Sequence, residues 1–346
     1  MRKVRVKINI YEKIGNNTKS SRKRVIPKAD FIESVRINDW WVIVKKDEFK
    51  VDDLVLYYEI DSFLPVKPEY EFLLRGSKPK KMLVDGVEVE GIRLKTVKLK
   101  DTISQGLVMP ISLLGAGIEG MVEGLDVSDL LGVIKYEMPI PAYLSGKVRG
   151  SFPSFIPKTD EERIQNMGGV LSGFYVTEKL DGSSITFYKF DGVFGVCSRD
   201  LELEESDVTQ WRLAKELNLP DKLPDNMALQ GELVGEGIQK NPLKLSGQKV
   251  FFFNAYNIKS GVFLDFIDFV QLCEALNLDV VPVIDDSFTL PRTVDDMLEY
   301  ADGKSMLNPE VDREGVVVRS KVEAGYRGGR LSFKAISNKY LLDYDA

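Results

Sequence analysis

The stretch Glu178-Lys179-Leu180-Asp181-Gly182-Ser183 follows an apolar run that is typical of a buried β-strand. A lysine held near cationic groups and a metal can be neutral enough to attack an α-phosphate. The glycine lets the backbone approach a nucleotide closely, and Asp181 points to the same side as Lys179 in an extended chain. There its carboxylate can hold metal-bound water or a ribose hydroxyl. Alone, such a string would occur by chance in roughly one protein in ten of this length, so its meaning depends on the rest of the chain.

Composition narrows the chemistry that this stretch can perform. The chain has 346 residues and no histidine, which excludes a Ser-His-Asp or Cys-His nucleophile, a histidine zinc site and a histidine general base. Cys197 and Cys273 give neither a disulfide framework nor the spacing of metal ligands. Catalysis must rest on the remaining polar side chains, which favours a lysine nucleophile and carboxylate-held Mg²⁺.

Two segments downstream carry residues that suit a nucleotide site. Glu232 ends a predicted strand and precedes the glycine-rich loop of QGELVGEGIQKN (230–241), where a carboxylate suits a contact with magnesium or ribose. In the aromatic strand VFFFN (250–254), alternation sends Phe252 to the face opposite its neighbours, so that one face can stack on a base. Taken singly, a Gly-Glu pair is more often a turn, and three phenylalanines in a strand are more often core.

Two further segments lie later in the chain. The segment DREGVVVR (312–319) has a carboxylate, Glu314, that leads into a buried strand. The segment LSFKAISNKY (331–340) has a lysine, Lys334, inside an apolar strand. A buried lysine costs free energy unless it is paired, and a phosphate is a natural partner. Taken singly, either segment would more often form a surface ion pair.

The length of the chain exceeds that of a typical single domain, so we expect two domains. The first ~130 residues have the short alternating runs and turn signals of an all-β domain. The expected strands are Val4–Ile10, Trp40–Lys45, Leu54–Ile60, Ile92–Leu99 and Gly106–Met109. Five short strands over about a hundred residues indicate a small barrel of the oligonucleotide-binding (OB) kind.

A stretch rich in Pro, Gly and Ser, IPAYLSGKVRGSFPSFIPK (140–158), predicts a linker or a connector along the surface. Beyond it the pattern becomes mixed. The expected strands are Phe174–Glu178, Ser184–Phe190, Val193–Ser198, Ala228–Leu233, Val250–Asn257 and Gly315–Arg319, and the expected helices are Ser206–Leu217, Phe266–Leu276 and Val294–Tyr300. We therefore expect an α+β chain with an OB-like nucleic-acid-binding domain over 1–135, a linker over 136–158 and a second domain over 159–346.

Charge is distributed unevenly along the chain. Residues 1–100 hold 23 Lys and Arg against 15 Asp and Glu, whereas the remainder holds 24 against 38. A basic first third suits a module that meets phosphates, although an ordinary solvated basic face fits the charge equally well. We find neither an apolar stretch long enough to span a membrane nor the features of a signal peptide. We therefore expect a cytoplasmic or nuclear protein.

In this order and at these separations, the segments resemble the covalent nucleotidyltransferase superfamily of ATP-dependent ligases and mRNA capping enzymes. The resemblance covers residues 159–346 and implies a nucleotidyltransferase domain of antiparallel sheets with flanking helices. After the nucleophile stretch, the positions that match its motifs are Ser198-Arg199, Glu232, Phe253, Glu314 and Lys334.

Within that superfamily the chain is most similar to nick-sealing RNA ligases of the Deinococcus and Naegleria type, which carry an OB domain at the N-terminus. The similar segments are TDEERIQN (159–166), GELVGEGIQKN (231–241) and SFKAISNKYLL (332–342). DNA ligases and capping enzymes place an OB domain after the fifth motif, whereas this chain ends at Ala346. A DNA ligase or a capping-type guanylyltransferase is the nearer alternative, and a catalytically silent nucleic-acid-binding protein is the more distant one.

The resemblance implies ATP-dependent joining of 3′-hydroxyl and 5′-phosphate RNA ends in three steps. Lys179 attacks the α-phosphorus of ATP and becomes lysyl-AMP, AMP passes to the 5′-phosphate, and the 3′-hydroxyl then displaces AMP. The expected partner is a nicked RNA or RNA/DNA duplex, and the expected state is a monomer.

The resemblance also implies roles for the site residues. Lys179 is the nucleophile, and Lys334 and Arg319 are expected to neutralise a phosphate. Mg²⁺ or Mn²⁺ is expected on Asp181, Glu232 and Glu314. The other expected nucleotide contacts, with Phe253 stacked on adenine, are Glu178, Gly182, Ser183, Arg199, Phe253, Arg163 and Gln165.

One departure from the family pattern concerns the fifth motif. Many RNA ligases have two lysines one residue apart there, whereas this chain has Lys334 and Ile336. Either Lys339 substitutes for the second lysine, or Lys334 acts alone.

Overall fold

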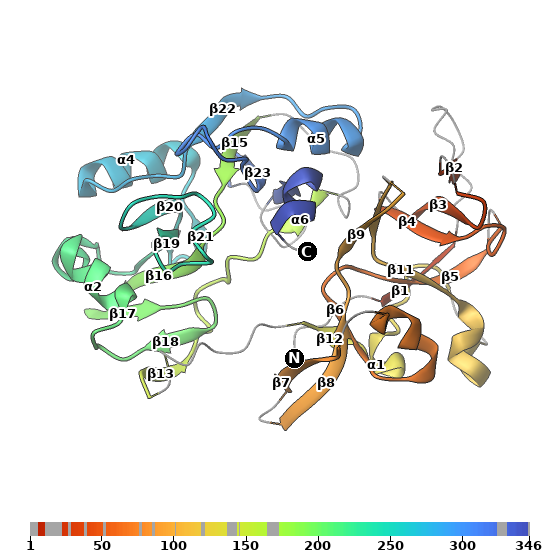
Figure 1. Ribbon diagram of the computed structural model, residues 1–346. Helices are drawn as coiled ribbons and strands as arrows, with labels where there is room; N and C mark the ends of the chain where they lie inside the picture. The colour runs from red at the N-terminus through yellow and green to blue at the C-terminus, as the bar shows by residue number, and fades with distance from the viewer. Residues whose placement is uncertain are drawn as a thin grey trace. The chain divides into compact units, whose positions relative to one another are not determined.

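The computed structural model of the protein describes residues 6–10, 23–26, 29–37, 40–50, 53–75, 78–84, 87–100, 102–118, 122–136, 144, 146–164, 173–323 and 331–344. The chain divides into two compact units (Figure 1), the first within Met1–Pro139 with Leu341–Ala346 and the second within Ile140–Tyr340. The described helices include none that is long and apolar enough to cross a membrane.

Short antiparallel strands build the first unit. Its described strands form sheets of the orders β1-β5-β11, β2-β3-β4, β12-β6-β8-β7 and β10-β9. They are β1 (Val6–Ile10), β2 (Lys23–Val25), β3 (Ile32–Ile37), β4 (Trp40–Lys45), β5 (Leu54–Tyr58), β6 (Ser62–Pro65), β7 (Lys80–Val84), β8 (Val87–Arg93), β9 (Thr96–Leu99), β10 (Thr102–Gln105), β11 (Leu107–Pro110) and β12 (Ile134–Lys135). The short helices η1 (Pro68–Leu74), η2 (Ile111–Ile118) and α1 (Ser128–Leu131) accompany them.

Strand β5 is buried on both faces and divides the core of the first unit. Val55 and Tyr57 pack in one cluster with residues of β3 and β4, such as Trp40. Leu56 and Tyr58 alternate to the other side, into a cluster of β6, β8 and α1 residues. This alternation explains why β5 is a continuous apolar run, because a strand with two buried faces has no polar side.

Where the structure describes them, the strands predicted for the first unit are present, with one error; Val4 and Arg5 of the predicted first strand lie outside the described residues. The run Ile92–Leu99, expected as one strand, is two, because β8 pairs with β6 and β9 pairs with β10. At the break between them, the Leu94 N–H donates to the Ser62 carbonyl and the Leu94 carbonyl accepts from the Asp61 N–H. The described strands β2, β3, β6, β7, β10 and β12 were not expected from the sequence.

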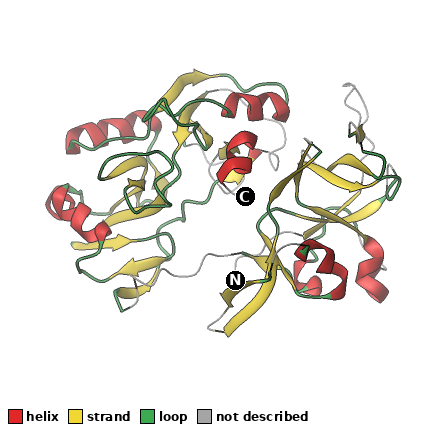
Figure 2. Ribbon diagram, viewed as in Figure 1, coloured by secondary structure: helices red, strands yellow, loops and turns green. Residues whose placement is uncertain are grey.

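Two sheets and several helices build the second unit (Figure 2). The seven-stranded sheet has the order β13-β18-β17-β16-β19-β20-β21, and the five-stranded sheet has the order β14-β24-β23-β15-β22. The strands are β13 (Val148–Ser151), β14 (Glu162–Arg163), β15 (Phe174–Lys179), β16 (Ser183–Phe190), β17 (Val193–Cys197), β18 (Leu201–Leu203), β19 (Met227–Gly235), β20 (Gln248–Asn257), β21 (Val262–Phe263), β22 (Val283–Phe288), β23 (Gly315–Ser320) and β24 (Ser332–Ile336). The helices are α2 (Thr209–Glu216), α3 (Leu219–Lys222), α4 (Phe266–Leu276), α5 (Val294–Ala301) and α6 (Asn338–Tyr344).

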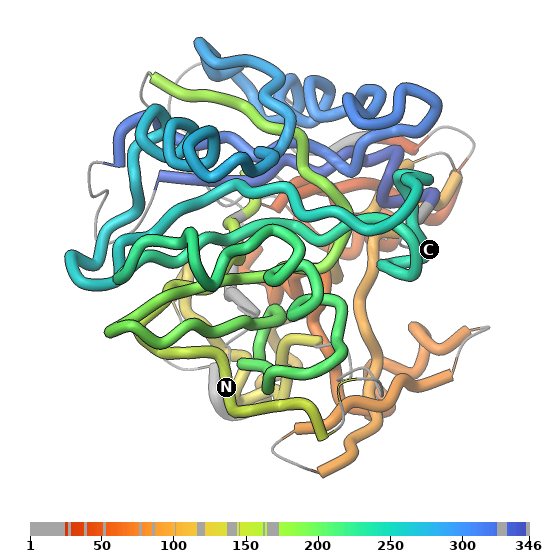
Figure 3. Tube along the Cα trace, turned by 90° about the vertical axis from the view of Figure 1, so that its left-hand side faces the viewer, coloured from red at the N-terminus to blue at the C-terminus, as the bar shows by residue number. Residues whose placement is uncertain are grey.

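Each sheet of the second unit packs its own helices. In the larger sheet, β16, β19 and β20 lie side by side (Figure 3), and Phe187, Leu229 and Phe252 on these strands pack with Trp211 of α2 and Phe269 of α4. Side chains of β15, β23 and β24 in the smaller sheet pack with Met297 and Ala301 of α5. The predicted antiparallel pattern is confirmed, except that β14 pairs with β24 in parallel.

The later half of the predicted linker packs on the second unit. Strand β13 pairs with β18, and Phe152 and Ile156 are buried against Tyr188 and Ala228. Residues 137–143 and 145 of the predicted linker lie outside the described residues. The predicted boundaries of the domains therefore stay a prediction, but β13 joins the seven-stranded sheet of the second unit, and Phe152 and Ile156 pack against it.

Candidate active site

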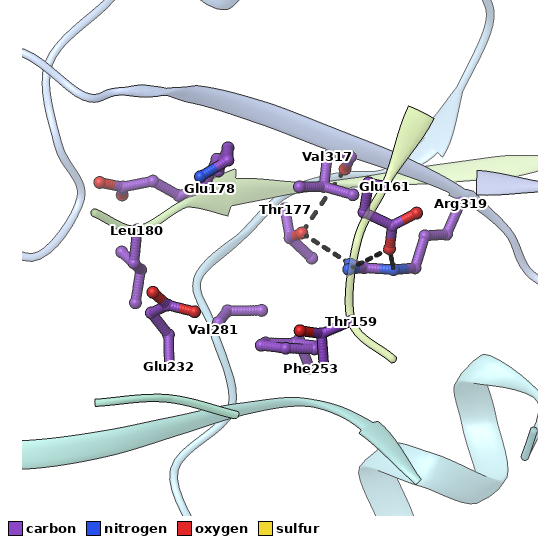
Figure 4. A pocket seen from close by; sticks show the side chains of 11 residues that line it. Thr159, Glu161, Thr177, Glu178, Leu180, Glu232, Phe253, Val281, Val317 and Arg319 are labelled. Carbon is purple, nitrogen blue, oxygen red and sulfur yellow. Dashed lines mark hydrogen bonds and ion pairs between the residues drawn. The ribbon is translucent and has the colours of Figure 1, made fainter. Parts of the chain in front are cut away.

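A cavity of about 460 Å³, including its open mouth, lies in the second unit between β15 and β19 (Figure 4). The side chains around it come from both sheets and from the segment ahead of the nucleophile stretch. They are Thr159, Glu161, Thr177, Glu178, Lys179, Leu180, Glu232, Phe253, Val281, Val317 and Arg319.

Lys179 is the last residue of β15, and its ammonium contacts a carboxylate on the neighbouring strand. The β15–β23 register pairs Lys179 with Gly315, which brings Glu314 next to it. Lys179 Nζ lies 2.6 Å from Glu314 Oε2, and the two side chains are 25% and 16% exposed. A pair that is this short and largely shielded from water interacts far more strongly than a surface ion pair.

The charge around Lys179 sets its protonation. Burial alone would lower the pKa of Lys179, but the carboxylates of Glu314, Glu232 and Asp181 outweigh it and raise the pKa above the ordinary value. Burial in turn raises the pKa of Glu314, and Lys179 opposes that shift. In this state the amine is a protonated donor, and it becomes a nucleophile only when the neighbouring negative charge is offset.

Glu232 lies on β19, where the register places it opposite Ser184 of β16. Burial raises the pKa of Glu232 to about 8, against the attraction of Lys179, and the carboxylates of Glu314 and Asp181 add to the rise. A carboxylate that resists ionisation in this way is typical of functional sites, because the fold alone would not select it.

This shift predicts a pH dependence of stability. Between the ordinary value of 4.5 and about 8, the unfolded chain loses the Glu232 proton and the folded protein keeps it. Ionisation therefore favours unfolding. We expect Glu232→Gln, measured without divalent cations, to gain stability relative to the wild type as the pH rises through this window, by up to about 1.4 kcal/mol per pH unit.

Chemical denaturation between pH 4.5 and 9 measures this difference. The control is Glu299→Gln, which changes an exposed carboxylate of α5. A Glu232→Gln difference from the wild type that is as flat with pH as that of the control would contradict the shifted pKa.

Close packing against β19 requires a glycine at position 182, which the sequence alone did not reveal. A Cβ added there would meet the Leu233 carbonyl oxygen, Val234 Cγ1 at 2.8 Å and Glu232 Cγ at 3.0 Å. The missing side chain lets the nucleophile turn lie directly against β19, which carries Glu232. The predicted approach of this glycine to a nucleotide stays a prediction, whereas its approach to β19 is part of the structure.

We expect Gly182→Ala to destabilise the second unit by about 1–3 kcal/mol, as overpacking does in a tight contact. It should also separate Lys179 from Glu232. Thermal unfolding measures the first effect. Gly150→Ala is the control, since a Cβ at Gly150 would meet nothing within 4 Å. Equal melting temperatures for the two variants would contradict the packing argument.

The predicted metal ligands are only partly brought together. Glu314 is paired with Lys179, and Asp181 Oδ2 accepts a hydrogen bond of 2.6 Å from the Tyr340 hydroxyl. Among the described residues, no group of three or more acidic, cysteine or histidine side chains is placed to hold a metal ion. The donor chemistry nevertheless fits Mg²⁺ or Mn²⁺, which take carboxylate oxygens and need only one or two of them beside water and phosphate.

Lys334 lies on β24, opposite Val317 of β23 and beside Arg163 of β14. Burial and the nearby cations Arg163 and Lys179 together lower the pKa of Lys334 to about 8, while Asp160 and Glu314 act against the shift. An anionic ligand would favour the charged form again. The structure therefore gives Lys334 the surroundings of a phosphate-binding lysine.

Phe253 and Arg319 form a wall of the cavity together with Glu161 and Thr177, which were not predicted as site residues. Arg319 is 2% exposed, and its Cζ lies 5.4 Å from the Phe253 ring centroid. Its guanidinium donates to Glu161 Oε1 at 2.9 and 3.2 Å and to the Thr177 hydroxyl at 3.3 Å. Because Glu161 already balances its charge, Arg319 positions the wall rather than offering an open cation, and its predicted phosphate contact stays a prediction.

Phe253 and its neighbours point as the alternation predicts. Phe251 and Phe253 share one cluster, with Phe253 against the cavity, and Phe252 is fully buried on the opposite face. Stacking of a base on Phe253 stays a prediction.

The remaining predicted nucleotide contacts differ in exposure. Glu178 is 1% exposed and accepts the Met306 N–H at 2.7 Å, and burial raises its pKa. Arg199 is half-exposed and donates to Asp160 at 2.9 Å. Ser183 begins β16 opposite Leu233. Gln165 lies outside the described residues.

The structure also bears on the missing second lysine of the fifth motif. Ile336 is buried at the end of β24, and Lys339 lies on α6, where its Nζ forms a 2.6 Å ion pair with Asp312. Lys339 is exposed and is not among the residues that line the cavity. This placement favours the second of the two alternatives, in which Lys334 acts alone.

A lysine at a strand end, beside carboxylates and opposite an aromatic wall, together with this two-sheet fold, defines a nucleotidyltransferase domain. The profile of the RNA ligase family matches residues 172–336, and an OB-fold domain profile matches residues 17–111. No curated protein matches the chain.

Solved structures extend the comparison over the whole chain. The Naegleria gruberi RNA ligase with PPi is 37% identical, with a TM-score of 0.83 and coverage of 99% of this chain and 98% of that chain. A mutant of the same ligase with AMP and Mn has equal identity and TM-score and covers 98% of both chains. A further mutant, with ATP and Mn, has a TM-score of 0.79 at 37% identity and covers 98% of this chain and 96% of that chain. The chain therefore belongs to the RNA ligase family, and the predicted α+β fold with an N-terminal OB domain is confirmed.

Proposed function

We propose that this RNA ligase uses ATP to seal 3′-hydroxyl and 5′-phosphate RNA ends through lysyl-AMP on Lys179. One observation carries the proposal. The Lys179 side chain lines the cavity and its amine contacts Glu314, while Glu232 and Asp181 act on it electrostatically. Structures of the related Naegleria gruberi RNA ligase with ATP, AMP, PPi and Mn fit this chemistry.

In the first step, Lys179 Nζ gives up a proton and bonds to the α-phosphorus, and the bond from that phosphorus to the pyrophosphate oxygen breaks. Phe253 is placed to stack on the base, and Lys334 to neutralise the α-phosphate. Transfers of this kind depend mainly on positioning and on stabilising charge, which are the contributions that these side chains make.

Asp181, Glu232 and Glu314 are the residues that would hold Mg²⁺ or Mn²⁺. A bound divalent cation would offset the negative charge that keeps Lys179 protonated, and it would screen the phosphates. These three carboxylates thus have two roles. They stabilise the Lys179 ammonium before the metal binds, and they would then bind the divalent cation.

In the second step, an oxygen of the RNA 5′-phosphate attacks the adenylyl phosphorus and the phosphorus–nitrogen bond to Lys179 breaks. In the third, the 3′-hydroxyl gives up its proton and attacks the activated 5′-phosphate, and AMP leaves. The half-exposed Arg199 is proposed to orient the ribose or the 5′-phosphate, and Lys334 to neutralise the phosphate. A monomer suffices for these steps, because every group named belongs to the second unit.

Incubation with α-labelled ATP and Mg²⁺ or Mn²⁺, followed by a denaturing gel, tests the first step. We expect the wild type to retain label covalently and Lys179→Ala to retain none, because Nζ is the atom that bonds to phosphorus. Lys215→Ala, which removes an exposed lysine paired with Glu205, is the control and should be labelled like the wild type.

Labelling with GTP in place of ATP would instead favour the capping-type alternative. A wild-type protein that takes no label from either nucleotide would leave a nucleic-acid-binding protein on a ligase fold.

The proposed substrate is a nick in an RNA or RNA/DNA duplex, and the first unit, in which residues 1–100 carry an excess of basic side chains, is the part that grips it. We expect a nicked duplex to be sealed faster than the same two strands without a template, because a template holds the ends within reach of each other. The loss of this difference when residues 1–135 are removed would support the role of the first unit. Equal rates on paired and unpaired ends would contradict nick sealing.

A further inference from the structure

The nucleophile belongs to a closed ring of contacts that passes through the start of α6. Lys179 contacts Glu314, and the Glu314 carbonyl accepts the Ser337 N–H at 2.9 Å. The Ser337 hydroxyl accepts the Tyr340 N–H at 3.1 Å, and the Tyr340 hydroxyl donates to Asp181 Oδ2 at 2.6 Å. Asp181 is two residues beyond Lys179, so the ring returns to its starting point.

The start of α6 is held firmly enough to act as a support. Ser337 caps the helix with its hydroxyl, as serine does at helix N-termini, and its own N–H fixes the cap to the Glu314 backbone. Lys339, one residue before Tyr340, is paired with Asp312 at 2.6 Å. Two contacts thus anchor this helix start to the segment that carries Glu314.

We propose that Tyr340 is a positioning residue, which orients the Asp181 carboxylate for the divalent cation used in Lys179 adenylylation. This inference rests on the proposed function. It assigns a role to a side chain that is not among those lining the cavity but holds Asp181, two residues beyond the nucleophile. It also gives Ser337 and Lys339 a purpose, since they set the place from which the Tyr340 hydroxyl reaches Asp181.

Geometry favours positioning over a purely structural bond. Tyr340 is 6% exposed, so its ring is fixed by packing, and its short bond to Asp181 orders one carboxylate oxygen. Hydrogen bonds to a charged acceptor are among the stronger ones in proteins. Supports of this kind around a metal ligand change metal affinity or activity by roughly 10- to 100-fold when they are removed.

The test compares Tyr340→Phe with Tyr188→Phe. Tyr188 offers a matched control, because it is 5% exposed and its hydroxyl donates to the Glu202 carboxylate at 2.6 Å, in a part of the second unit away from the cavity. Each variant loses one hydroxyl and one short bond to a carboxylate. Melting temperatures report the shared cost in stability.

We expect Tyr340→Phe to slow single-turnover adenylylation by roughly 10-fold or more and to raise the Mn²⁺ concentration for half-maximal rate. Tyr188→Phe should behave like the wild type in both. Binding of Mn²⁺ in the presence of α,β-methylene-ATP, followed by the electron paramagnetic resonance of free Mn²⁺, gives a readout that needs no turnover. Tyr340→Phe should bind Mn²⁺ more weakly there as well.

A double-mutant cycle with Asp181→Asn asks whether Tyr340 acts through Asp181. We expect the Tyr340 change to cost nothing further once Asp181 is neutral. An equal loss in both backgrounds, or a slower rate with unchanged Mn²⁺ binding, would overturn the inference. Failure of the wild type to form lysyl-AMP would instead overturn the proposed function, so the two failures are distinguishable.

Discussion

The contact between Lys179 and Glu314 is the constraint on which the site depends. It joins the ends of β15 and β23, and it exists because the register of these two strands places Gly315 opposite Lys179. Gly315 belongs to this constraint too, since a Cβ there would meet the Ala335 carbonyl and the Cα of Ile336 on β24. Strands β15, β23 and β24 can therefore bring Glu314, Lys179 and Lys334 close together only if residue 315 has no side chain.

The site places carboxylates where they cost stability. Glu232 and Glu314 both have raised pKa values because burial opposes their ionisation. Such a cluster is not what a fold would select for its own stability, since a buried charge needs a partner. Its presence is reasonable in a ligase because the reaction brings a divalent cation and a phosphate to the same place. The cation would offset the charge of the carboxylates, and the phosphate would offset the charge of Lys334.

Much of this arrangement could be predicted from the sequence. Strong local patterns located β4 and α4 to the residue, and the order of the motifs identified the family. Contacts between distant segments could not be predicted in the same way. Glu161 meets Arg319 across 158 positions of the chain, and no periodicity reports such a pairing. No helix was predicted after Lys334, although Ser337, three residues before Tyr340, is a helix-capping signal that could have separated β24 from α6.

The absence of histidine affects which side chains of this protein exchange protons near neutral pH. Histidine ordinarily supplies most protein buffering near neutrality, and here it contributes none. Both cysteine thiols have pKa values raised by burial, Cys273 to about 12. Among the described side chains with shifted pKa values, those that move to about 8 are Glu232 and Lys334, and both belong to the site. Proton exchange by Glu232 and Lys334 near this pH would thus contribute to the heat of nucleotide loading, and calorimetry in buffers of different ionisation enthalpy could measure how that contribution changes when either residue is replaced.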